Sequence, residues 1–295
     1  MPVLSIVVCR MLEDELAHIL SADEETRELI LVDGIESIRL SEKLKSLGRP
    51  HILLSRPQIA GDLEQKSRIS NHQQGLFSRL MASLRPPPRG KSNLVVVVSP
   101  LRIGLHVSLE RLQSAVYKEI RQLAAFSNGV LLFYGRCGGS LADAKEDLFD
   151  LPCPLYFLGD EQGERIDDCI AAALGGNEIY SRTLAEHQDV ALFMTPMWAA
   201  NWKAMGQEES GSSRKGDMQS MLKRSGLTKV ARIDTGLALE KGFDENVEDF
   251  ARQFGLKKIQ LEGGTRVAER SYQQTKRQLM KCWAMHGDQD PSCRS

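Results

Sequence analysis

The chain has 295 residues, 42% of them hydrophobic and 26% charged, with 38 Lys and Arg residues against 39 Asp and Glu residues. This length and composition predict a globular protein with a substantial core, and they exclude a wholly disordered chain. The formal net charge of −1 argues against a nucleic-acid-binding protein, which would carry a basic excess. No apolar run approaches the roughly 20 residues that a membrane-spanning helix needs.

The first residues predict a cytoplasmic protein. The apolar run Val3–Val8 has no basic segment before it and no small-residue cleavage site after it, so it does not have the pattern of a signal peptide. We interpret it as a buried strand that leads into a helix over residues 11–20. We therefore expect no membrane and no nucleic acid among the partners, while the oligomeric state is left open.

Short apolar runs alternate with helical patterns along the rest of the chain. The strongest strand signal is Leu94–Val98 with its four consecutive valines, and an amphipathic helix follows at Ser108–Phe126. Such alternation predicts an α/β fold with a doubly wound, mostly parallel, Rossmann-like sheet and helices on both faces. Further strands are expected at Glu28–Val32, His51–Leu54, Gly129–Tyr134, Pro154–Leu158, Val190–Thr195, Thr228–Asp234 and Lys257–Leu261, and further helices at Arg165–Leu174 and Asp244–Phe254.

The predicted domain organisation is simple. One α/β domain should cover residues 1–270, and residues 271–295 should form a C-terminal helix and tail. Residues 55–93 are polar and end in three consecutive prolines, which indicates a partly helical insertion closed by a stiff linker. Residues 206–217 read GQEESGSSRKGD, a composition typical of a mobile loop.

Three of the six cysteines fall where a parallel sheet binds its ligands, outside the carboxyl ends of the strands. Cys9 ends the first strand, Cys137 lies three residues after Tyr134, and Cys169 lies one element beyond the strand at Pro154–Leu158. The loop after the valine strand delivers His106 to the same edge. Thiolates together with an imidazole form a ligand set suited to zinc or iron.

Other interpretations of these residues are open. A cysteine at the end of an apolar strand is most often a small buried hydrophobe, and the chain has no C-x-x-C motif. Gly135, Gly138 and Gly139 around Cys137 are consistent with a tight turn, with a weak anion cradle, or with the close approach of a bound group. Trp198 could wall a cofactor pocket or belong to the core.

The order of several short motifs resembles the family known as domain of unknown function 1638, from Val3 to about Arg270. None of these motifs is specific alone, but their order and spacing together are. This chain departs from the family pattern at Asp167, where a His is usual, and at Met197, where a Gly is usual. The first feature of the pattern is the start of the chain around Cys9 and Glu15. The motifs that follow it in order are Gly104-Leu105-His106, Tyr134-Gly135-Arg136-Cys137-Gly138-Gly139-Ser140-Leu141, Asp167-Asp168-Cys169-Ile170, Leu174-Gly175-Gly176, Tyr180, Thr195-Pro196-Met197-Trp198 and Asp234-Thr235-Gly236.

The resemblance implies a shared zinc or iron site at Cys9, His106, Cys137 and Cys169, with Asp167 or Glu15 as the fourth partner if His106 points away. Members of the family are often encoded beside corrinoid-dependent methyltransferase systems. This implies a role in methyl-group or one-carbon transfer, with a small molecule or a corrinoid protein as partner and a corrinoid as a second cofactor. Two alternatives are an accessory protein that delivers a metal or cofactor without turnover, and a metal-free binding domain with buried cysteines.

Overall fold

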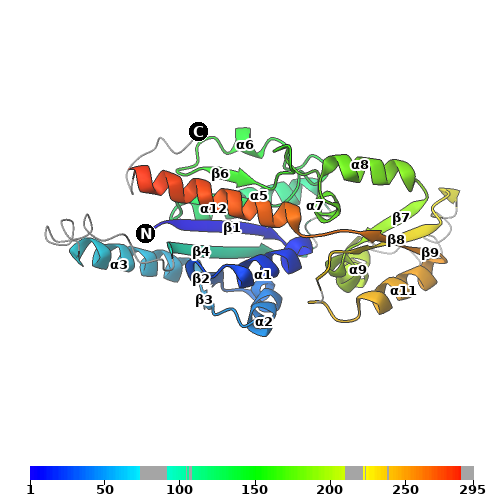
Figure 1. The fold of residues 1–295 in the computed structure, drawn as a ribbon, viewed down its shortest axis with the longest axis horizontal. Helices are drawn as coiled ribbons and strands as arrows, with labels where there is room; N and C mark the ends of the chain where they lie inside the picture. The colour runs from blue at the N-terminus through cyan, green and yellow to red at the C-terminus, as the bar shows by residue number, and fades with distance from the viewer. Residues whose placement is uncertain are drawn as a thin grey trace.

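The computed structural model describes residues 1–73, 92–103, 105, 108–209, 222, 224–237 and 239–286. Its largest element is a six-stranded parallel sheet, which confirms the predicted α/β class (Figure 1). The central strand β1 (Val3–Cys9) is buried along its whole length, as its continuous apolar sequence predicts. In spatial order the strands are β3 (Ile52–Leu54), β2 (Thr26–Val32), β4 (Ser92–Leu101), β1, β5 (Gly129–Phe133) and β6 (Leu155–Phe157).

Helices cover both faces of this sheet. The connection from β1 to β2 runs one way across the sheet and the connection from β4 to β5 runs the other way. Right-handed crossovers therefore place α1 (Glu13–Ala22) and α5 (Leu109–Ala124) on opposite faces. α1 packs against α2 (Ile38–Ser46) and against the long C-terminal helix α12 (Arg266–His286), so these three helices share one face (Figure 1). The sheet face on which α1 or α5 packs is therefore set by the direction in which the chain crosses the sheet, and not by the sequence of the helix itself.

A buried polar cluster holds α12 against the start of β2. Lys276 Nζ and the Tyr272 hydroxyl donate hydrogen bonds to the Asp23 carboxylate at 2.7 and 2.5 Å, and Thr26 Oγ1 donates at 2.7 Å. Burial alone would raise the pKa of Asp23, but these hydrogen bonds outweigh it and lower the pKa to about 2. The C-terminal helix is thus attached by specific bonds as well as by apolar packing.

The last three strands form a separate parallel sheet. Its strands are β7 (Val190–Met194), β8 (Lys229–Asp234) and β9 (Lys257–Glu262), and it carries α9 (Pro196–Glu209) and α11 (Phe243–Phe254). Trp202 of α9 packs edge-on against Phe250 and Phe254 of α11 at centroid distances of 5.2 and 6.2 Å. Figure 1 shows this sheet beyond the carboxyl ends of the strands of the first sheet. The strand positions were predicted, but their division between two sheets was not.

The predicted insertion and loop are partly visible. Residues 56–73 form α3 (Arg56–Gln73), as the helical interpretation of the insertion predicts, and residues 74–91 lie outside the described part of the chain. The prediction of a loop from residue 206 was wrong at its start, because α9 continues to Glu209; residues 210–217 again lie outside. Among the described residues, no helix combines the length and the apolar composition needed to cross a membrane.

Candidate thiol site where the two sheets meet

Cys9 is delivered to the candidate site by the central strand. It is the last residue of β1, its side chain is 3% exposed, and it pairs in register with Leu101 at the end of β4. The chain then turns through a short 3-10 helix (Arg10–Leu12) into α1. Cys9 therefore lies at the carboxyl edge of the sheet, as its place in the sequence predicts.

Cys137 is brought to the same edge by a close contact between two loops. The backbone N–H groups of Arg136 and Cys137 donate to the carbonyl oxygens of Ile166 and Asp167 at 2.9 and 2.8 Å. This approach requires a glycine at position 135, because a Cβ there would lie 2.5 Å from Cα of Asp168. Gly135 is thus explained by the close packing of its loop against the loop that leads to Cys169.

Cys137 itself has an unusual backbone conformation. Its φ of 48° makes it the only non-glycine residue with positive φ in the described part of the chain. The left-handed region costs about 1–2 kcal/mol for a residue with a Cβ. The exposed Gly138 and Gly139 continue the left-handed turn with φ values of 66° and 88°. The turn therefore places the Cys137 thiol in a conformation that a residue with a Cβ seldom adopts.

Cys169 is the first residue of α7 (Cys169–Leu174). The helix predicted from Arg165 begins four residues later, because Asp168 is its N-cap and accepts hydrogen bonds from the N–H groups of Ile170 and Ala171 at 2.8 Å. The indole N–H of Trp198 donates to the sulfur of Cys169 at 3.4 Å. Trp198 lies in α9, so this contact links the two sheets at the thiol site.

The three thiols lie within electrostatic range of one another. Burial is the main cause that raises the pKa of each thiol, to about 12 for Cys137. Cys137 further raises the pKa of Cys9, and Cys9 further raises that of Cys169. The buried Tyr134 phenol has its pKa raised by burial and then by all three cysteines. Three separate segments thus bring their thiols within electrostatic range of the Tyr134 phenol, and burial favours the neutral form of each thiol.

The other predicted ligands have different outcomes. His106 lies outside the described residues. The Asp167 side chain is 46% exposed and lies 3.6 Å from Arg136, so it faces a guanidinium at the surface. Glu15 is 2% exposed, and it contributes to raising the pKa of Cys9. Within the described ranges, no group of three His, Cys, Asp or Glu side chains is already arranged to hold a metal ion.

A buried charged cluster beside the thiols was missed by the sequence analysis. Lys43 Nζ lies 2.7 Å from Glu13 Oε1, 2.6 Å from Asp14 Oδ1 and 2.6 Å from Glu240 Oε1. It also donates to the sulfur of Met197 at 3.0 Å. Lys43 therefore connects α1 and α2 of the first sheet to segments of the second. The acidic run after Cys9 is visible in the sequence, but it looks like an ordinary helix start, and nothing around Lys43 marks it as buried.

A family model for the description Protein of unknown function (DUF1638) matches residues 100–272. The match covers more than half of the chain, so the chain belongs to this family, and the resemblance found in the sequence is confirmed. His106, Cys137, Cys169 and Trp198 fall within the matched residues, whereas Cys9 precedes them. No curated protein and no solved structure matches the chain.

Proposed function

We propose that Cys9, Cys137 and Cys169 bind a zinc or iron ion as thiolates, and that the bound ion serves a methyl-transfer reaction. The observation that carries the proposal is the gathering of three thiols from three distant segments at one sheet edge. Cys9 ends a strand, Cys137 lies in a loop, and Cys169 begins a helix. The thiols also influence one another's pKa, as neighbouring ligand thiols would.

The chemistry of the donor set fits a thiophilic metal. Burial keeps the three thiols protonated on their own, and a divalent cation offsets the repulsion between thiolates by binding them directly. Three thiolates leave one position for a fourth protein ligand or for a substrate. His106 follows Leu101, the register partner of Cys9, by five residues in the sequence, and it is the imidazole that we propose as the fourth ligand. Glu15 is the alternative fourth ligand, because it is buried and its charge contributes to raising the pKa of Cys9.

The methyl-transfer role rests on the chemistry of such a site and on what the family resemblance implies. Cys9, Cys137 and Cys169 would hold the ion, which would supply Lewis acidity that lowers the pKa of a substrate thiol and so favours its use as a methyl acceptor. In this chain the Trp198 indole N–H holds the sulfur of Cys169, and the buried surroundings of Cys9 exclude water. A corrinoid protein is the proposed methyl donor. A protein that only delivers a metal or a cofactor would bind the same ion without turnover.

Metal analysis of anaerobically purified protein tests the binding proposal. The native chain should carry about one zinc or iron ion, because one set of thiolates binds one ion. Cys137→Ser should lose most of this metal while remaining folded. Cys153→Ser is the matched control, because Cys153 is also a buried cysteine but precedes β6 and so lies at the opposite edge of the sheet. Equal metal content in both variants would contradict the proposal.

A second assay tests the reaction. The metal-loaded protein is incubated with a methylated corrinoid and a small thiol, and formation of the thioether is followed together with the loss of the methylated corrinoid. Turnover that requires Cys137 but not Cys153 supports catalysis by the thiol site. Bound metal without turnover supports the delivery role.

A further inference from the structure

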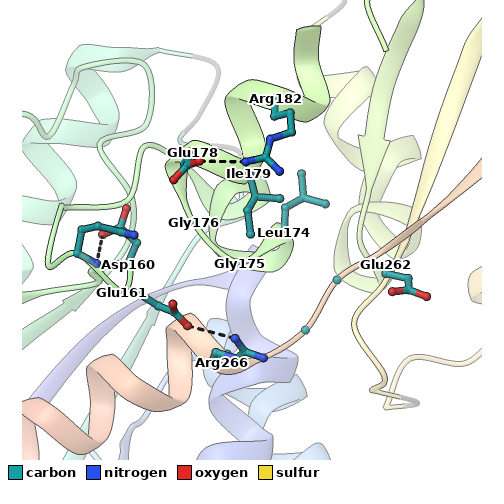
Figure 2. Close-up of a pocket in the computed structure, with 13 residues that line it drawn as sticks. Asp160, Glu161, Leu174, Gly175, Gly176, Glu178, Ile179, Arg182, Glu262 and Arg266 are labelled. Carbon is teal, nitrogen blue, oxygen red and sulfur yellow. Dashed lines mark hydrogen bonds and ion pairs between the residues drawn. The ribbon is translucent and has the colours of Figure 1, made fainter. Parts of the chain in front are cut away.

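A pocket of about 440 Å³ lies between the carboxyl end of α7, the start of α8 (Asn177–Glu186) and the segment that joins β9 to α12. Its volume falls within the range of about 300–1,000 Å³ that is typical of small-molecule sites. Figure 2 shows its charged and apolar residues. None of the residues that line it is a proposed metal ligand, so the inference drawn from it does not depend on the metal.

The arginines of the pocket are already neutralised by carboxylates. Arg182 Nη2 donates to Glu178 Oε1 at 2.9 Å, and Arg266 Nη1 donates to Glu161 Oε1 at 3.1 Å (Figure 2). These two ion pairs contribute no net charge. Any net charge of the pocket therefore comes from its remaining ionisable groups.

Two further carboxylates leave the pocket negatively charged. Asp160 and Glu262 line it, and neither has a counter-ion among the described residues. The start of α8 adds about half a positive elementary charge, which is too little to reverse the sign. The pocket therefore attracts cations and disfavours anions.

Asp160 is the buried member of this pair. It is 6% exposed, and its Oδ1 atom accepts hydrogen bonds from the backbone N–H groups of Gln162 and Glu164 at 3.1 and 2.9 Å. Its Oδ2 atom accepts no hydrogen bond within the described part of the chain. This oxygen is therefore available to a ligand, and a positively charged N–H donor would form a charge-assisted hydrogen bond with it.

The rest of the lining suits a short hydrocarbon chain. Leu174 and Ile179 line the pocket, and Ile179 is 44% exposed although it is a large aliphatic residue. At Gly264 a Cβ would have no atom within 4 Å, and the N–H of Gly264 donates to the carbonyl oxygen of Ala173 at 2.8 Å. The backbone at position 264 therefore does not require a glycine, and the absence of a side chain there leaves space in the pocket.

We propose that this pocket binds a small organic cation, namely a protonated amine on a short hydrocarbon chain. The ammonium group donates to Oδ2 of Asp160, and the hydrocarbon chain packs against Leu174 and Ile179. The class of ligand follows from the negative charge of the pocket, the available Oδ2 acceptor of Asp160 and the apolar side chains of Leu174 and Ile179.

Calorimetry or ligand-observed NMR with n-butylammonium tests the proposal on the full-length protein, with n-butyrate as the matched anion. Binding of n-butylammonium should weaken about tenfold or more in Asp160→Asn, which removes the charge but keeps the Oδ1 acceptor. Gly264→Leu should weaken it, because the added side chain would occupy part of the pocket. Glu186→Gln should leave it unchanged, because Glu186 is an exposed carboxylate of α8 outside the pocket lining.

Three results would overturn the proposal. The first is failure of n-butylammonium to bind the native protein at about 10 mM, well above a millimolar dissociation constant. The second is binding of n-butyrate as strong as that of n-butylammonium. The third is unchanged n-butylammonium binding in Gly264→Leu, which would place the cation elsewhere on the surface. Gly264→Leu decides the matter even if Asp160→Asn is too unstable to measure.

Discussion

The substitution Glu15→Gln should stabilise the protein at alkaline pH. Glu15 is 2% exposed, and burial followed by the charge of Asp14 raises its pKa from 4.5 to about 8. The unfolded chain therefore releases the Glu15 proton far more readily than the folded chain does. A carboxyl group of this kind costs nothing below pH 4.5 and lowers the free energy of unfolding progressively as the pH rises towards 8.

The magnitude follows from the difference between the two pKa values. Each pKa unit corresponds to about 1.4 kcal/mol, so the cost grows to about 2 kcal/mol at pH 6 and about 4 kcal/mol at pH 8. Glutamine has the same shape and no ionisable proton, so Glu15→Gln removes this pH-dependent cost. The gain in stability over the native chain should accordingly be near zero at pH 4.5 and reach about 4 kcal/mol at pH 8.

Urea unfolding of both proteins at four pH values between 5 and 8 measures the gain directly. Taking the difference between variant and native chain removes the contributions of the other ionisable groups. Glu186→Gln is the matched control, since Glu186 is exposed, and its difference should stay near zero throughout. A Glu15→Gln difference that does not grow with pH would refute the reasoning and show that Glu15 is ionised in the folded protein.

Three further substitutions test other parts of the structure. Lys43→Met should lower the free energy of unfolding by about 3–5 kcal/mol, because it leaves buried carboxylates without their cation, whereas the exposed Lys45→Met should change it little in the same urea titrations. Gly135→Ala should destabilise by about 1–3 kcal/mol and reduce bound metal, while Gly61→Ala, with open space around it, should not. Asp23→Asn should lower the free energy of unfolding by about 2 kcal/mol above pH 4, because the ionised Asp23 stabilises the folded chain there. The native chain loses this stabilisation as the pH falls towards 2, so the melting temperatures of native and variant chains should converge in acid.

The strands of the first sheet could be predicted because burial on both faces requires continuous apolar sequence. Leu94–Val98 illustrates this, since every one of its residues is fully buried in β4. The rule that ligands bind beyond the carboxyl ends then predicted the neighbourhood of Cys9, Cys137 and Cys169 without knowledge of the strand order. Of the three, Cys9 is the residue whose place at a strand end could be predicted directly.

The partition into two sheets was not predictable from the same signals. Val190–Met194 and Lys229–Asp234 have strand patterns like those of the first sheet, and only their pairing partners differ. The helices at Ile38–Ser46 and Asn177–Glu186 were also missed. The first is short and carries only Leu40 and Leu44 as buried apolar residues, and no residue of the second is buried.

The arrangement of the two sheets explains why the site residues that sequence analysis missed lie beside those it found. The carboxyl ends of the second sheet face the first, because Trp198 follows β7 and reaches Cys169 while Gly264 follows β9 and bonds to Ala173. Each sheet alone would leave its loop residues at an open edge. Facing each other, the two edges bury the thiols, and the same burial forces the charges of the adjoining loops to be paired, as Lys43 is with its three carboxylates. Burial between two facing edges is therefore the common cause of the neutral thiols, the raised pKa of Glu15 and the buried ion cluster.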